Sequence, residues 1–79
     1  MGVLRLIKET FNYSKLRKKI KQICITQELF AEKMGLSSAT ISDKLNNKVE
    51  FKQNEINLAC VILGIDIKEI SAYFFCTSS

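Results

Sequence analysis

The sequence contains no proline, no histidine and no tryptophan, and it has only three glycines among its 79 residues. Without histidine the chain lacks the most common general base, and no serine or cysteine stands beside a plausible substitute. It also has no glycine-rich phosphate loop and no cluster of metal ligands. These absences predict a protein that is not an enzyme and that needs no cofactor and no metal.

Cysteine is also scarce, because the chain has three, an odd number, and none in the C-x-x-C spacing of zinc or redox sites. Cys24 and Cys60 stand among apolar neighbours at helical spacing, which predicts buried free thiols and a reducing compartment. No apolar run approaches the roughly 20 residues that span a bilayer, and residues 1–10 are not typical of a secretion signal. We therefore expect a cytoplasmic protein with no membrane partner.

Charge is distributed unevenly along the chain. The net charge is +4, and residues 1–52 hold 11 lysines or arginines against 5 acids, whereas residues 53–79 hold 1 against 3. Clustered cations favour a polyanionic partner, because they release counterions when they neutralise phosphates. The alternative is that these charges only keep a surface soluble. We expect most lysines of the basic run 15–21 to form such a solvated helix face.

Helical periodicity predicts an all-α fold, because no segment keeps the two-residue alternation of a strand. Thr26 and Ser37 are good N-cap residues, and Gly35 suits the left-handed position that follows a helix. Asp66 and Glu69 have the spacing of a capping box. The pattern predicts five helices: residues 12 or 14 to 23, about eight residues between Thr26 and Gly35, a third helix that Ser37 opens and that ends near 46–47, residues 53 to 63, and a short stretch from 66 that includes Ile70.

This division leaves residues 1–11 as an N-terminal extension, residues 12–75 as one domain, and residues 76–79 as a tail that frays. The domain ends in three aromatic residues, Tyr73, Phe74 and Phe75. These rings either pack back on the first and fourth helices or form part of a dimer surface. The sequence leaves both interpretations open.

The segment 26–48, TQELFAEKMGLSSATISDKLNNK, resembles the helix-turn-helix of lambda-type phage repressors and Cro proteins. The positions that agree with that family's pattern are Thr26, Gln27, Phe30, Ala31, Gly35, Leu36, Ser37, Thr40, Ile41 and Ser42. A basic helix before the motif and two helices after it reproduce the five-helix order of the family's DNA-binding domain. More loosely, the chain is similar to small Cro-like regulators encoded in prophages of Gram-positive bacteria.

The resemblance implies a five-helix, lambda-repressor-like domain whose third helix lies in the major groove of DNA. It implies a sequence-specific transcriptional regulator that binds double-stranded operator DNA as a homodimer, in the nucleoid of a bacterial host. Four side chains would then face the bases, namely Ser38, Ala39, Ser42 and Asp43. The phosphates would be contacted by Gln27, Ser37, Thr40, Lys44, Asn46, Asn47 and Lys48.

Two features of the motif are unusual for a protein that binds DNA sequence-specifically. Between Ser38 and Asp43 there is no Arg, Gln or Asn that could make a bidentate contact with a base. Leu29 stands where related sequences place a polar residue and faces away from the buried stripe of its helix, so that it is either exposed or covered by the apolar segment 3–11. The alternative function is therefore an antirepressor or modulator that acts by binding another phage repressor protein.

Overall fold

The computed structural model describes residues 10–77, and these residues form five α-helices and one 3₁₀-helix. In chain order they are α2 (Ser14–Cys24), α3 (Gln27–Met34), α4 (Ser38–Leu45), α5 (Gln53–Leu63), η1 (Ile67–Glu69) and α6 (Ile70–Phe74). Within residues 10–77 there is no strand, and extended backbone meets only in an isolated antiparallel bridge between Phe11 and Thr77. The predicted all-α, five-helix fold is confirmed.

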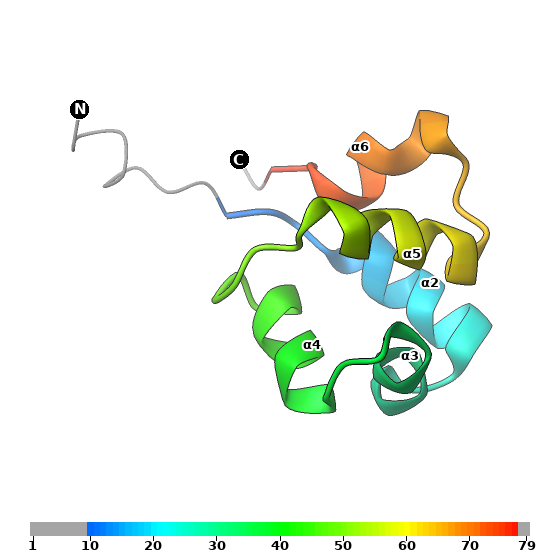
Figure 1. The fold of residues 1–79 in the computed structure, drawn as a ribbon. Helices are drawn as coiled ribbons and strands as arrows, with labels where there is room; N and C mark the ends of the chain where they lie inside the picture. Colours follow the sequence, from blue (N-terminus) through cyan, green and yellow to red (C-terminus); the bar gives the residue numbers. More distant parts are fainter. Residues whose placement is uncertain (1–9, 78–79) are drawn as a thin grey trace.

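The helices surround one core. Figure 1 shows α5 and α6 across α2, with α3 and α4 together at the end of the molecule that lies away from α6. Each fully buried large apolar side chain contributes about 1.5 to 3 kcal/mol relative to an exposed one. The largest of these side chains are Phe30, Phe74, Leu16, Ile20, Ile41 and Leu63. They come from α2, α3, α4, α5 and α6, so that the core joins all five α-helices.

The starts and ends of α3 and α4 follow from the chemistry of single residues. Thr26 Oγ1 accepts a hydrogen bond from the N–H of Leu29 at 3.1 Å, and Ser37 Oγ accepts one from the N–H of Thr40 at 3.1 Å. Gly35 follows α3 with a φ of 74°, in the left-handed region that glycine adopts without steric cost. These three predicted helix ends are confirmed, and they leave only a tight turn between α3 and α4.

The predicted capping box at the C-terminal end forms differently. Asp66 Oδ1 accepts from the N–H of Lys68, at 3.0 Å, and not from the N–H of Glu69. The short aspartate side chain reaches the N–H two residues on, which makes an Asx-turn and opens the 3₁₀-helix η1. For this reason the α-helix α6 begins only at Ile70.

The N-terminal strap, which we define as residues 10–13, is held to both the α4–α5 loop and the C-terminal end. The N–H of Phe11 donates to Asn47 Oδ1 at 2.9 Å, and Asn47 Nδ2 donates to the Phe11 carbonyl at 3.0 Å. The N–H of Asn12 donates to the carbonyl of Cys76 at 2.6 Å. We expected the chain to fray from Cys76, but Cys76 and Thr77 pair with the strap. Residues 1–9 of the expected extension, and 78–79 of the expected tail, lie outside the described residues.

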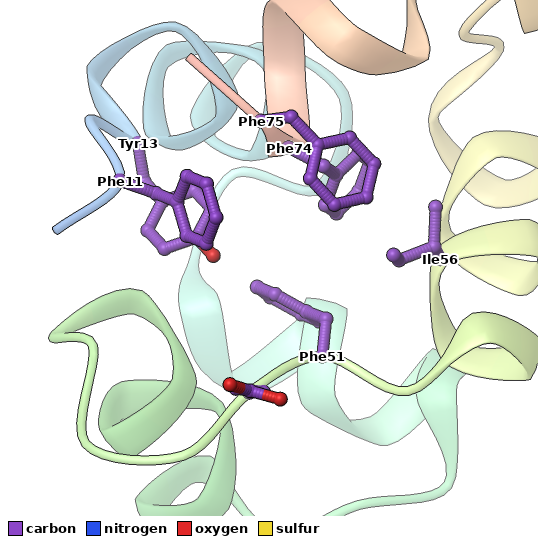
Figure 2. Close-up of a pocket in the computed structure, with 7 residues that line it drawn as sticks. Phe11, Tyr13, Phe51, Ile56, Phe74 and Phe75 are labelled. Carbon is purple, nitrogen blue, oxygen red and sulfur yellow. The ribbon is translucent and has the colours of Figure 1, made fainter. Parts of the chain in front are cut away.

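An aromatic cluster packs the strap against the rest of the domain (Figure 2). Its neighbouring rings have centroids 5.2 to 6.1 Å apart and surround a cavity of about 170 Å³. The cluster consists of Phe11, Tyr13, Phe51, Phe74 and Phe75. Tyr73 and Phe74 are buried, so these two pack back on the domain, while Phe75 stays half exposed. The cluster therefore explains the C-terminal aromatic run mainly by packing.

The three cysteines are free thiols, with Cys24 buried, Cys60 partly buried and Cys76 exposed. The prediction of a buried thiol is confirmed for Cys24 and holds in part for Cys60, whose pKa is raised by burial. Among residues 10–77, no helix has the length and apolar character needed to cross a membrane.

Candidate interaction face

The segment 26–48 folds into a helix-turn-helix whose two helices are in direct contact. Phe30, Ala31 and Ile41 are buried between them and the core, and the Ala31 carbonyl accepts from the N–H of Leu36 at 2.9 Å. A larger side chain than Ala31 would push α3 and α4 apart, because protein interiors are close-packed. The tight packing presents the outward side chains of α3 and α4 as one surface, which we call the HTH face.

The side chains that α4 turns outward are small, and the only charge among them is negative. Ser38 and Ala39 are exposed, whereas Ser42 and Asp43 are half-buried. The structure thus brings the four predicted base contacts together on one helix, whose one cation, Lys44, is buried. The carboxylate of Asp43 repels phosphate oxygens, since like charges at short range destabilise a complex.

Lys44 does not take the phosphate-binding position that we predicted for it. Its ammonium is buried, lies 2.9 Å from Glu55 Oε1 and donates to the carbonyl of Glu50 at 3.1 Å. Glu55 Oε1 also accepts from the N–H of Lys52 at 2.8 Å. Burial by itself raises the pKa of Glu55, but the Lys52 N–H and the Lys44 ammonium outweigh it and hold that pKa below its ordinary 4.5. The pair therefore fastens α4 to α5 inside the protein.

The two asparagines after α4 are also engaged within the protein. Asn47 has a φ of 63° and binds both backbone groups of Phe11. Asn46 Oδ1 accepts from the guanidinium of Arg17 at 3.0 Å, and Arg17 also donates to the carbonyl of Leu45 at 3.2 Å. Arg17 thereby caps the negative end of α4. Both asparagine side chains, which we predicted to bind phosphates, serve local structure.

The remaining predicted phosphate contacts do not make the HTH face basic. The hydroxyls of Ser37 and Thr40 bond to each other at 2.8 Å, Gln27 is half-buried, and Lys48 is exposed. Apart from the buried Lys44, segment 26–48 has fewer cations than acids, with Lys33 and Lys48 against Glu28, Glu32 and Asp43. Exposed cations lie instead on α2, at Lys15, Lys18 and Lys21.

An apolar turn between α2 and α3 borders the HTH face, and it was not predicted from the sequence. Ile25 is 70 % exposed, and Ile23 and Leu29 on either side are 47 % and 43 % exposed. Leu29 points outward as expected, and residues 3–9 of the segment that could cover it lie outside the described residues. A cavity of about 270 Å³ at this turn is lined by Arg17, Ile20, Lys21, Ile25 and Gln27. The signal for this turn is a branched apolar residue directly after a helix, where glycine or asparagine is usual.

Comparison with known proteins identifies a matching family and a similar solved structure. The family model described as "Protein of unknown function (DUF739)" matches residues 9–77. The solution structure of the modulator of repression (MOR) of the temperate bacteriophage TP901-1 from Lactococcus lactis is 46 % identical to this chain. That match covers 82 % of this chain and 88 % of the modulator, with a TM-score of 0.74. No curated protein matches the sequence.

These matches correct two predictions. The assignment to the lambda-type repressor and Cro family is wrong, because the family model and the modulator identify a different family. The main functional prediction, a DNA-binding transcriptional regulator, is also wrong, since the similar phage protein is a modulator of repression and favours the alternative. The motif led to the wrong function because its residues determine how two helices pack, and helices that pack in this way serve more than one function.

Proposed function

We propose that this chain, which belongs to the family described as "Protein of unknown function (DUF739)", modulates phage repression by binding a repressor protein. The observation that carries the proposal is the 46 % identity, over most of both chains, to a phage modulator of repression. The proposed activity is binding alone, without catalysis, cofactor or metal.

The composition of the HTH face supports a protein partner. Binding to the phosphate backbone depends on cations that displace counterions, and α4 keeps its one lysine in a buried pair with Glu55. Small side chains such as Ser38 and Ala39 let another protein surface approach closely. A protein interface of ordinary size needs no excess of positive charge.

Calorimetry with two ligands tests this proposal. The chain is titrated with the repressor protein of the phage that carries it and, separately, with a duplex of that repressor's operator at low salt. We expect saturable binding of the repressor and no saturable binding of the duplex alone. Binding of the duplex by the chain, with affinity that falls steeply as salt rises, and no heat with the repressor would overturn the proposal.

A pair of charge insertions locates the contact. Ala39→Arg places a long cation on the exposed surface of α4, and Ile67→Arg places the same residue on η1, at the other end of the molecule (Figure 1). If the repressor covers α4, Ala39→Arg weakens its binding by about tenfold or more, which corresponds to about 1.4 kcal/mol, while Ile67→Arg changes it little. Equal effects of both variants would argue against contact through α4.

A further inference from the structure

The turn that joins α2 to α3 holds Ile25 in a conformation that branched residues avoid. Ile25 has a φ of 73° and a ψ of −50°, and the N–H of Thr26 donates to the carbonyl of Cys24 across it at 2.8 Å. This is a γ-turn with positive φ, a rare and strained turn. An isoleucine at positive φ is a genuine conformational outlier, because its Cβ crowds the backbone.

The other helix ends with positive φ in the described residues use glycine or, at Asn47 after α4, an asparagine, and both residue types tolerate this region better than a branched residue does. Gly35 follows α3 with a φ of 74°, and Gly64 follows α5 with a φ of 69°. Ile25 occupies the corresponding place after α2, yet its side chain is 70 % exposed, so burial in the core does not offset the strain. Residues held in strained backbone conformations cluster at functional sites.

The surroundings of Ile25 combine apolar surface with positive charge. Ile23 and Leu29 add exposed apolar area before and after the turn. The cavity at the turn is lined by two cations, Arg17 and Lys21, and by the amide of Gln27, with no acid among its lining residues. Since Arg17 already donates to Leu45 and Asn46, the exposed Lys21 is the one of these two cations that can form an ion pair with a partner.

We propose that Ile25 is the central contact of this surface for the protein partner, which presents an apolar side chain with a carboxylate beside it. The inference rests on the proposed function and names the surface that performs it. The apolar group of the partner packs on Ile25, Ile23 and Leu29, and its carboxylate pairs with Lys21. A nucleic acid fits less well, because a phosphate backbone offers no apolar group to cover an exposed isoleucine.

The strain makes an unusual test possible, because one substitution acts in opposite directions on folding and on binding. Ile25→Gly relieves the backbone strain, so that the melting temperature stays the same or rises by up to about 8 °C. The same change removes the apolar contact and weakens repressor binding by about 10- to 100-fold. Ile67→Ala is the matched control, since Ile67 is 79 % exposed on η1 and its loss leaves repressor affinity within about twofold.

The outcomes separate this inference from the proposed function. If the wild-type chain binds no repressor, both fail. If the wild type binds and Ile25→Gly binds equally well, only the role of Ile25 fails. A fall in melting temperature for Ile25→Gly contradicts the claimed strain. If Ile25→Gly loses binding to operator DNA but keeps binding to the repressor, the partner at this surface is DNA and not a protein.

Discussion

Replacement of Lys44 by methionine tests the buried ion pair that removes this residue from the HTH face. Methionine keeps the unbranched shape of the lysine side chain and removes its charge. In the variant the partly buried carboxylate of Glu55 loses its paired cation, and the Glu50 carbonyl loses its donor. Removal of one partner from a buried pair typically costs about 3 to 5 kcal/mol.

The structure places the loss at the lower end of that range. Glu55 keeps its hydrogen bond from the Lys52 N–H, and its side chain is 13 % exposed, so that water and one donor still solvate it. We expect a loss of about 3 kcal/mol in the free energy of unfolding, out of roughly 4 to 12 kcal/mol for a chain of this length. For a domain of this size the melting temperature then falls by about 12 to 24 °C.

The assay is urea denaturation of four proteins at neutral pH. The wild type and Lys44→Met are compared with the double variant Lys44→Met/Glu55→Gln, whose neutral amide still accepts from Lys52, and with Lys48→Met as an exposed control. The double variant should recover to within about 1 kcal/mol of the wild type, and Lys48→Met should lie within about 0.5 kcal/mol. If Lys44→Met is no less stable than Lys48→Met, the ammonium is not held in the protein and is available to phosphates.

Three further predictions concern residues that stabilise the fold around the HTH face, namely Glu55, Asn47 and Gly35. Because the folded-state pKa of Glu55 is depressed, its contribution to stability is full above its ordinary pKa of 4.5 and is lost as the pH falls through the lower folded value. Melting temperatures from pH 7 to pH 3 should therefore fall further below pH 4.5 for the wild type than for Glu55→Gln, and parallel curves would contradict this. Asn47→Gly keeps the left-handed backbone but removes two hydrogen bonds to the strap, so that the free energy of unfolding in urea falls by about 1 to 2 kcal/mol. A loss below about 0.3 kcal/mol would show that these bonds do not stabilise the fold. Gly35→Ala should cost about 1 to 2 kcal/mol from its φ of 74° alone, since no atom beyond the adjoining residues lies within 4 Å of the added carbon. A loss above about 3 kcal/mol would indicate a clash that the structure lacks.

Helix positions could be predicted from the sequence because they depend on local chemistry. Thr26 and Ser37 cap the helices that follow them, and Gly35 ends α3, through atoms no more than four residues away. Asp66 shows the limit of this reasoning, because a short acid can bond to the second or the third N–H that follows it.

The roles of the polar residues on the predicted DNA-binding surface could not be read in the same way. Lys44 pairs with Glu55, and Asn47 binds Phe11 from 36 residues away along the chain. Only the folded chain brings these groups together, so a motif that aligns Lys44 and Asn47 with phosphate ligands does not reveal their partners. Ile25 was missed for another reason, since a branched residue after a helix becomes significant only when its φ is positive, and that backbone angle is known only from the structure.

Operator occupancy by the repressor tests the central claim most directly. Labelled operator DNA is held with enough repressor to occupy about half of it, and the chain is added in increasing amounts while anisotropy reports the bound fraction. If the chain modulates repression by binding the repressor, the bound fraction changes near stoichiometric amounts of chain to repressor, and the chain without repressor leaves the anisotropy unchanged. The account is contradicted if the chain alone raises the anisotropy of the operator DNA in a salt-dependent way and does not change how much repressor binds to DNA that the chain leaves free.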